Sequence, residues 1–167
     1  MFKELEKLSK MNDRNKYTSF VSTNEPIERL TVNYYFDSKS KIGYSEVEFH
    51  EGSQGPPNYV HGGALMAIFD ELMGATAWLC KSPSMTVEHK TYFLAPVPLG
   101  SKLLFSCYIK KTEGRKIYVE GVVKDESGQT YARAEGLFIK ITKEHFLRSD
   151  KIPKELMDKM NNEGVSI

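Results

Sequence analysis

The sequence has little cysteine and no excess of charge of either sign. Its 167 residues contain two cysteines, Cys80 and Cys107, which form no paired-cysteine motif. We expect both to be reduced and structural, without a disulfide framework. The 23 basic residues are balanced by 22 acidic ones, which leaves a net charge of +1 and no electrostatic field for nucleic acid or an anionic membrane. The composition therefore argues against both as partners.

Metal-binding and phosphate-binding motifs are missing as well. No paired helical spacing or ligand cluster accompanies the four histidines, His50, His61, His89 and His145. Neither the glycine spacing of a dinucleotide site nor that of a P-loop occurs. We therefore expect no metal and no bound cofactor.

The first eleven residues lack the apolar stretch that a secretion signal requires. The acids Glu4 and Glu6 among them also argue against an organelle transit peptide. We therefore expect a cytoplasmic protein. The length fits one domain with an ordinary hydrophobic core.

The longest apolar stretch runs from His61 to Trp78 and is interrupted by two adjacent acids, Asp70 and Glu71. We interpret it as one helix buried inside the protein, because a helix that is apolar all round has no face for water. Acids at mid-span do not suit a membrane helix, where each would cost roughly 2.5 to 3.5 kcal/mol. No membrane span is predicted.

Small residues share one face of this predicted helix with an acid. At spacings of 4, 3, 4 and 3 they are Gly63, Ala67, Asp70, Gly74 and Ala77. Such neighbours let a ligand or another backbone approach the carboxylate of Asp70. A buried carboxylate without a partner shifts its pKa or does chemistry, so Asp70 is a candidate catalytic residue. We expect Glu71 to be a paired or exposed acid on the neighbouring face, and keep it as a second candidate for the working carboxylate.

The start of the helix offers a second chemical feature. Gly62 and Gly63 would expose backbone N–H groups at the positive end of the helix dipole, where a developing oxyanion is stabilised. A structural alternative stays open, because two glycines at this turn can simply relieve backbone strain.

Strand patterns flank the helix on both sides. Alternating apolar residues predict a hairpin or two separate strands over residues 30–49, and a loop rich in glycine and proline follows at 51–58. Four further runs, separated by turn signals, predict an antiparallel meander over 85–96, 101–111, 116–125 and 130–142. The fold class is therefore α+β, an antiparallel sheet wrapped around a long central helix. Short terminal helices are predicted near 2–11 and 150–164.

These elements and motifs together resemble the hotdog-fold acyl-CoA thioesterases. The similarity is to the branch with a His-Gly-Gly turn, here residues 61–63, and an aspartate nine residues after the histidine, here Asp70. That branch, which includes the phenylacetate-pathway and thioesterase-superfamily-member enzymes, also places a serine or threonine sixteen residues after the aspartate, where Thr86 stands. Pro96 and Gly100 fit the pattern further along the chain.

The resemblance covers about residues 40–143 and implies a single hotdog domain over 1–167, with short helical extensions at both ends. One position departs from the pattern. Some members of the branch carry an asparagine six residues before the histidine, where this chain has Gly55. Asn58 is close to that position but out of register.

By this resemblance the protein hydrolyses an acyl-CoA thioester to a free acid and coenzyme A, without a cofactor. Asp70 would attack the thioester carbonyl or activate a water, and the Gly62 amide would bind the oxyanion. Thr86 would position the water or the carboxylate, and His61 would fix the turn or lie near the leaving sulfur. Because Gly62 would come from the partner chain, function requires a homodimer. Further pairing into a tetramer stays open.

The resemblance also suggests which residues bind the substrate. The candidates beside the acyl group and the thioester are Gly63, Asn58 and Glu71. The candidate cations for the coenzyme A phosphates are Lys90, Lys110, Lys111, Arg115 and Lys116. Two alternatives to hydrolysis remain, which are a hotdog dehydratase or hydratase and a non-catalytic protein that binds or senses acyl-CoA.

Overall fold

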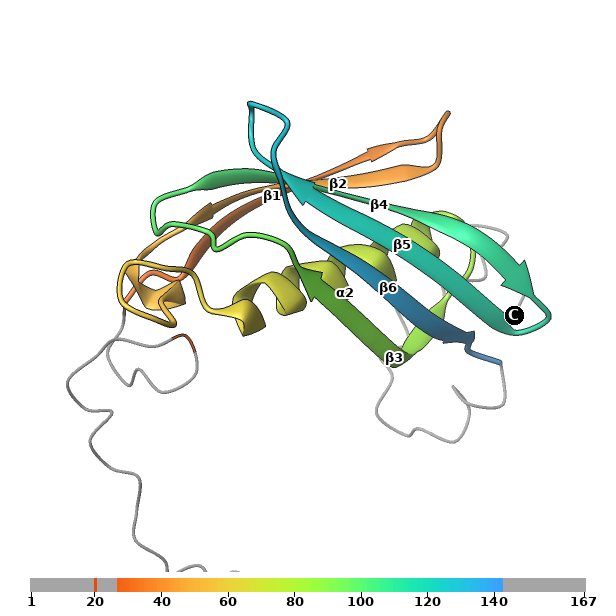
Figure 1. Cartoon of the computed structure of the whole chain (residues 1–167). Coiled ribbons are helices and arrows are strands. Elements are labelled where there is room, and N and C mark those ends of the chain that lie inside the picture. Colours follow the sequence, from red (N-terminus) through yellow and green to blue (C-terminus); the bar gives the residue numbers. More distant parts are fainter. Residues whose placement is uncertain (1–19, 21–26, 143–167) are drawn as a thin grey trace, which may run out of the picture.

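The computed structural model describes Phe20 and residues 27–142, and Figure 1 shows one long helix against one sheet. The elements are β1 (Leu30–Asp37), β2 (Ile42–Phe49), a short 3-10 helix η2 (Glu51–Ser53), α2 (Gly62–Leu79), β3 (Ser84–Phe93), β4 (Lys102–Glu113), β5 (Lys116–Lys124) and β6 (Thr130–Lys140). The terminal helices predicted near 2–11 and 150–164 lie outside the described residues. The predicted hairpin over 30–49 and the central helix are confirmed.

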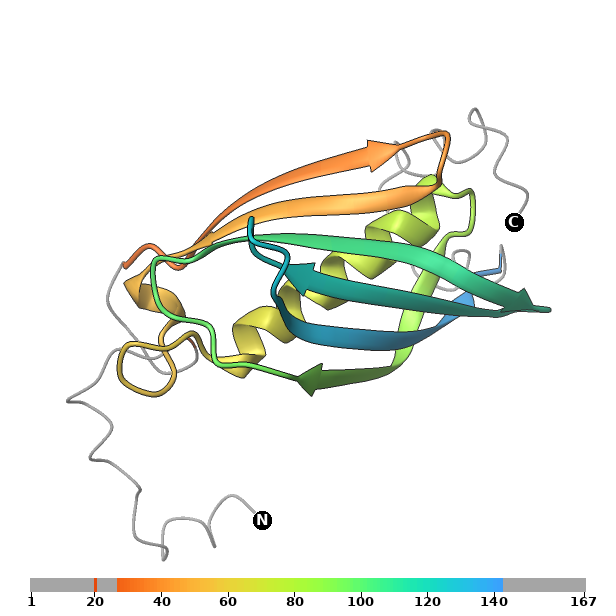
Figure 2. The same ribbon diagram turned by 45° about the horizontal axis from the view of Figure 1, so that its top comes forward.

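All strand pairs are antiparallel, in the order β1-β2-β4-β5-β6-β3. Figure 2 shows the sheet curved over one side of α2, with β1 and β3 at its two edges. The predicted α+β architecture, a sheet wrapped around a central helix, is confirmed.

The predicted meander is wrong for its first strand. We expected β3 to neighbour β4, but β3 pairs with β6 and β4 pairs with β2. The reason lies in the connection between β3 and β4. It contains Pro96 and Pro98, which have no N–H and do not support a tight hairpin. Two backbone bonds also hold it against the loop before α2, because the Val60 N–H donates to the Val97 carbonyl and the Leu99 N–H donates to the Asn58 carbonyl.

Helix α2 buries only one face in the single chain. The face against the sheet consists of Ala64, Leu65, Ile68, Phe69, Leu72, Met73, Thr76 and Ala77. The opposite face is exposed and carries Met66, Ala67, Asp70, Glu71 and Ala75. The prediction of a helix buried on all sides is therefore wrong for one chain, because the sheet covers only one side of it.

The core between sheet and helix is built from aromatic and aliphatic side chains. Phe69 of α2 packs edge-on against Phe105 of β4, with ring centroids 4.9 Å apart. Cys107 is buried in this core, where burial raises the pKa of its thiol, and Cys80 caps the end of α2. Both cysteines are free, as the sequence predicted. Within the described residues, no helix combines the length and the hydropathy of a membrane span.

Candidate active site

The first turn of α2 is fixed by the side chain that precedes it. His61 is the N-cap residue, and its Nδ1 accepts a hydrogen bond of 2.8 Å from the Gly63 N–H. Because Nδ1 accepts, the proton of the neutral ring is on Nε2. The Gly62 N–H has no acceptor among the described residues. We expected the amides of both Gly62 and Gly63 to be free, and this is wrong for Gly63.

Contacts with the preceding loop and with Phe20 fix the position of His61 at this turn. The His61 N–H donates to the Ser53 carbonyl at 2.8 Å, and the ring of Phe20 stacks on the imidazole with centroids 6.0 Å apart. A Cβ on Gly55 would lie 2.8 Å from the His61 Cα, so this position has no room for a side chain. The close approach explains why glycine stands where the resemblance led us to look for asparagine.

Asn58 has a structural place in the same loop. Its backbone has a φ of 68°, a left-handed conformation that asparagine adopts more readily than most residues. Its N–H donates to Gln54 Oε1 at 3.1 Å, and its carbonyl accepts from the Leu99 N–H at 3.0 Å. The exposed Asn58 therefore joins the loop to the β3–β4 connection, and its role toward a substrate stays a prediction.

Asp70 lies on the exposed face of α2 and meets β3. The Thr86 Oγ1 donates a hydrogen bond of 2.8 Å to Asp70 Oδ1. Thr86 is placed for this contact because it pairs in register with Phe138 of β6, whose side chain is buried between sheet and helix. The structure therefore brings together two of the four predicted catalytic residues within one chain.

Glu71 faces the other way. The Tyr34 hydroxyl on β1 bonds to its carboxylate, and burial together with this bond raises the pKa of Tyr34. Successive helix residues are turned by about 100°, because one turn takes 3.6 residues. The Asp70 carboxylate therefore interacts with a side chain of β3, and the Glu71 carboxylate interacts with a side chain of β1. Glu71 is thus a paired acid on the neighbouring face, as the sequence suggested.

His89 is a neighbour of the site that the sequence did not single out. Its imidazole lies 6.5 Å from the Phe69 ring between centroids, and burial lowers its pKa while the charge of Asp70 opposes part of that shift. Simple strand alternation puts His89 on the face opposite to Thr86. A bulge between Thr86 and Glu88 reverses the alternation and turns His89 inward, opposite Gly136. Only a signal for the bulge would have revealed it.

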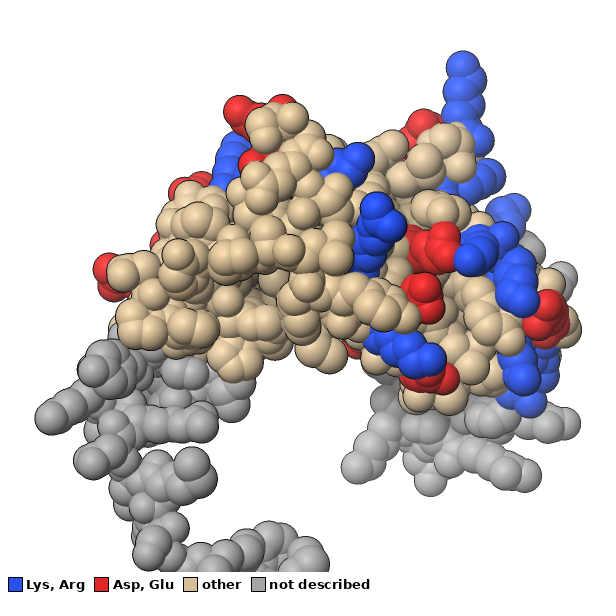
Figure 3. Space-filling view, in the orientation of Figure 1, with Lys and Arg blue, Asp and Glu red and all other residues tan. Residues whose placement is uncertain are grey.

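The predicted phosphate-binding cations do not surround Asp70. Lys90 pairs with Glu88 at 2.7 Å and, with Lys110 and Lys111, lines a cavity of about 360 Å³ over β3–β6. Lys90 and Glu88 are each one position from His89, so they point to the outer face of the sheet. Figure 3 shows lysine and arginine side chains interleaved with acids near the β4–β5 end of the sheet. The Arg115 guanidinium donates to the Lys140 carbonyl at 3.1 Å, and Lys116 begins β5.

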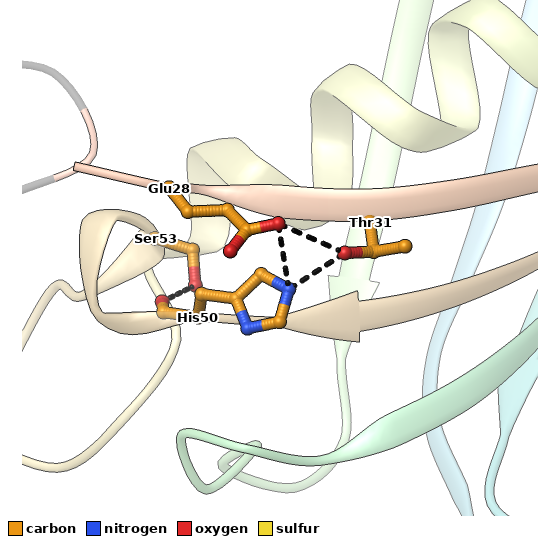
Figure 4. Close-up of polar contacts among 4 residues, drawn as sticks. All are labelled: Glu28, Thr31, His50 and Ser53. Atoms are coloured by element: carbon orange, nitrogen blue, oxygen red, sulfur yellow. Dashed lines mark hydrogen bonds and ion pairs between the residues drawn. The ribbon is translucent and has the colours of Figure 1, made fainter. Parts of the chain in front are cut away.

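A second polar cluster involves His50 (Figure 4). Its Nε2 lies 2.7 Å from Thr31 Oγ1 and 3.6 Å from Glu28 Oε1, and its carbonyl accepts from Ser53 Oγ at 2.6 Å. A catalytic triad needs the acid on one ring nitrogen and the hydroxyl on the other. Here both groups face the same nitrogen, so the cluster fastens the start of β1 to the end of β2. In the part of the chain that the structure describes, no group of three or more acids, histidines or cysteines could hold a metal.

A curved antiparallel sheet wrapped around one long helix defines the hotdog fold. Residues 57–132 match the family model of the thioesterase superfamily. Acyl-coenzyme A thioesterase THEM4 of Mus musculus is 35% identical over 109 residues, which cover 63% of this chain and 47% of the relative. The chain spans less than half the length of the curated relatives that it matches, between 36% and 47%.

Solved structures share the fold. A thioesterase superfamily protein aligns with a TM-score of 0.62 and 28% identity over 65% of this chain and 53% of that one. A Streptococcus mutans UA159 protein, solved bound to acetyl CoA, aligns with a TM-score of 0.62 and 17% identity over 74% of this chain and 97% of that one.

Proposed function

We propose that this protein is an acyl-CoA thioesterase, which hydrolyses an acyl-CoA thioester to a free acid and coenzyme A. The observation that carries the proposal is the bond of 2.8 Å between Thr86 and Asp70 on the open face of a helix whose first amide, that of Gly62, has no acceptor among the residues that the structure describes. The names of the curated relatives, which are acyl-coenzyme A thioesterases, support the same activity.

The two halves of the site come from two chains. Gly62 and Asp70 are eight residues apart on one helix, a separation of about 12 Å at 1.5 Å per residue. A thioester carbonyl needs the oxyanion donor within about 3 Å of its oxygen and the attacking group near its carbon. One chain cannot meet both needs. A second copy, with its helix antiparallel beside the first, would bring its Gly62 to Asp70, and by two-fold symmetry the reverse also holds.

The surface for this homodimer is the exposed face of α2 together with the free edge of β3. Among the described strands β3 pairs only with β6, so its other edge has no strand partner there. Apolar side chains with exposed fractions of 39% to 65% gather on these two elements and the residue after them: Met66, Met85, Val87, Phe93 and Leu94. Exposed apolar side chains around an open strand edge are typical of a protein interface.

The reaction follows from these positions. Thr86 holds one oxygen of the Asp70 carboxylate, and the other oxygen is left to attack the thioester carbon or to take a proton from an attacking water. The Gly62 N–H of the second chain stabilises the negative charge that develops on the carbonyl oxygen. The C–S bond then breaks and the thiolate of coenzyme A takes up a proton. When a water attacks, the acyl group leaves directly as the acid with the oxygen of that water. When Asp70 attacks, the acyl group is first held as an anhydride on Asp70, and a water then cleaves this anhydride to the acid and the free carboxylate.

The remaining predictions belong to this proposal. We propose that three cations, Lys90, Arg115 and Lys116, bind the phosphates of coenzyme A. Lys90 would then give up its ion pair with Glu88, and Arg115 its bond to the Lys140 carbonyl, in favour of the phosphates. His61 is proposed to act through the turn that it caps, because its Nδ1 is occupied by Gly63. The cytoplasmic location, and the absence of a cofactor other than the coenzyme A of the substrate, also stay predictions.

One observation favours a second candidate, an acyl-CoA hydratase or dehydratase. Such an enzyme needs a histidine and an acid acting on the acyl chain, and His89 interacts electrostatically with Asp70. The candidate predicts that water adds to a 2-enoyl-CoA, which lowers the enoyl absorbance without releasing thiol.

The test measures thiol release from short, long and aromatic acyl-CoA substrates. We expect the parent protein to turn over at least one of them and Asp70→Asn to lose about 100-fold or more, a loss within the range for one acid–base group. Glu71→Gln is the matched control, since Glu71 is the adjacent acid but faces Tyr34, and should keep most of the activity. Binding of these thioesters without thiol release by the parent protein would overturn the proposal.

A further inference from the structure

His89 lies between the elements that build the site, although it makes no direct bond to either catalytic candidate. Thr86, which holds Asp70, comes three positions earlier on β3. Phe69, which immediately precedes Asp70 on α2, lies against the imidazole with centroids 6.5 Å apart. His89 is therefore bracketed by the neighbours of Asp70 on both elements.

The two ring nitrogens of His89 have few hydrogen-bond partners among the described residues. Its Nε2 is fully buried and has no hydrogen-bond partner among the described residues. Its Nδ1 is 3.4 Å from Thr91 Oγ1, at the outer limit of a hydrogen bond. An apolar side chain would avoid the cost of burying Nε2 without a hydrogen bond. Packing alone therefore does not explain why a histidine occupies this position.

Within the described chain, Asp70 is the residue whose negative charge acts on the His89 ring, and this charge favours the protonated form. On β6, the strand beside it, the inward residues are apolar: Ala134, Gly136 and Phe138. On β4 the inward Cys107 is neutral, because burial raises the pKa of its thiol. The neighbours of His89 on its own strand, Glu88 and Lys90, pair with each other on the outer face of the sheet.

We propose that His89 is a positioning residue for Asp70. While the His89 ring is neutral, the Asp70 carboxylate stays bonded to Thr86. When the His89 ring is protonated, it forms an ion pair with the Asp70 carboxylate, which can then no longer take part in the reaction. Burial lowers the pKa of His89 below its ordinary value, so the ring is neutral at neutral pH and becomes charged only in acid. Activity is then present above the pKa of His89 and is lost as the pH falls through it. The catalytic consequence rests on the proposed function, whereas the coupling between His89 and Asp70 does not.

Histidine titration by NMR tests the coupling without any substrate. The chain has four histidines, and the signal of His89 is the one that His89→Gln removes. In the parent protein we expect His89 to titrate below the ordinary value of 6.5. In Asp70→Asn the midpoint should fall further, by about half a pH unit or more, because the carboxylate favours the charged ring. An unchanged midpoint in Asp70→Asn would overturn the proposal, whether or not the protein hydrolyses thioesters.

The pH profile of thiol release tests the catalytic consequence. We expect the acid limb of the parent profile to follow the His89 midpoint, and His89→Gln, which cannot be charged, to move that limb down by about half a pH unit or more. His50→Gln is the matched control, because His50 lies in the separate cluster with Glu28 and Thr31, and its profile should follow the parent. An acid limb that is the same in the parent and His89→Gln would also overturn the proposal. A parent without thiol release would contradict the proposed function alone.

Discussion

Thr86 Oγ1 on β3 donates a hydrogen bond of 2.8 Å to Asp70 Oδ1 on α2. The bond links an edge strand to the exposed face of the central helix and fixes one carboxylate oxygen. The other oxygen has no hydrogen-bond partner within the described part of the chain, and the roles proposed for Asp70 and Thr86 depend on this difference between the two oxygens.

Thr86→Val removes the hydroxyl and keeps the shape of the side chain. We expect kcat for thiol release to fall by about 10-fold to 100-fold with a smaller change in KM, because the carboxylate loses the group that orients it. Thr86→Ser is the control and should retain most of kcat. Steady-state kinetics on the best substrate of the panel measure both, and equal losses in the two variants would show that the hydroxyl has no part in the reaction.

The Gly62 amide can be deleted by substitution, because Gly62 is the first residue of α2. Proline suits this position in a helix and has no N–H. Gly62→Pro should therefore lower kcat by about 100-fold to 1,000-fold, the usual effect of losing one oxyanion donor.

Gly62→Ala controls for the steric cost of that change. A Cβ at this position would lie 3.0 Å from the ring of Phe93, so both variants push against the same ring, but alanine keeps the amide. We expect Gly62→Ala to lose much less activity than Gly62→Pro. Thiol release by the two purified variants measures the difference, and equal losses would mean that the amide is not the oxyanion donor.

Met66 should lie on the two-fold axis of the proposed dimer, since it is midway between Gly62 and Asp70 on the exposed face of α2. Met66→Asp would place two carboxylates against each other there, and we expect it to produce a monomer without thioesterase activity. Light scattering after gel filtration measures the mass. Tyr92→Asp is the control, because Tyr92 is also exposed but pairs in register with Arg133 on the outer face of the sheet, and this variant should remain a dimer. An active monomer of Met66→Asp would contradict the shared site.

The parts of the structure that depend on local sequence were predictable. The apolar run from His61 to Trp78 predicted the helix, and the alternation over residues 30–49 predicted the hairpin. The sixteen-residue spacing between Asp70 and Thr86 drew attention to two residues that the structure brings into contact. Their catalytic roles came from the resemblance and remain proposals.

The parts that depend on contacts between distant segments were not predictable. The position of β3 at the sheet edge depends on which strand it pairs with. The prolines in the Pro96–Gly100 connection disfavour a tight hairpin from β3 to β4, but they do not identify β6 as the partner. The occupied amide of Gly63 depends on a side-chain rotamer of His61. His89 was hidden by a single bulge between Thr86 and Glu88. The exposed face of α2 looked like a buried one because Met66, Ala67 and Ala75 on it are apolar.

Mixing two inactive variants tests the central claim most directly. Asp70→Asn keeps Gly62, and Gly62→Pro keeps Asp70, so in a mixed dimer one site receives both intact groups only if the site is shared between chains. We predict that each variant alone releases almost no thiol from the acyl-CoA panel, and that subunit exchange between them restores activity of up to about half that of the parent per mixed dimer, since one of two symmetric sites is complete. If light scattering and differential tagging show mixed dimers but thiol release stays at the level of the separate variants, Asp70 and the Gly62 of a second chain do not form the active site.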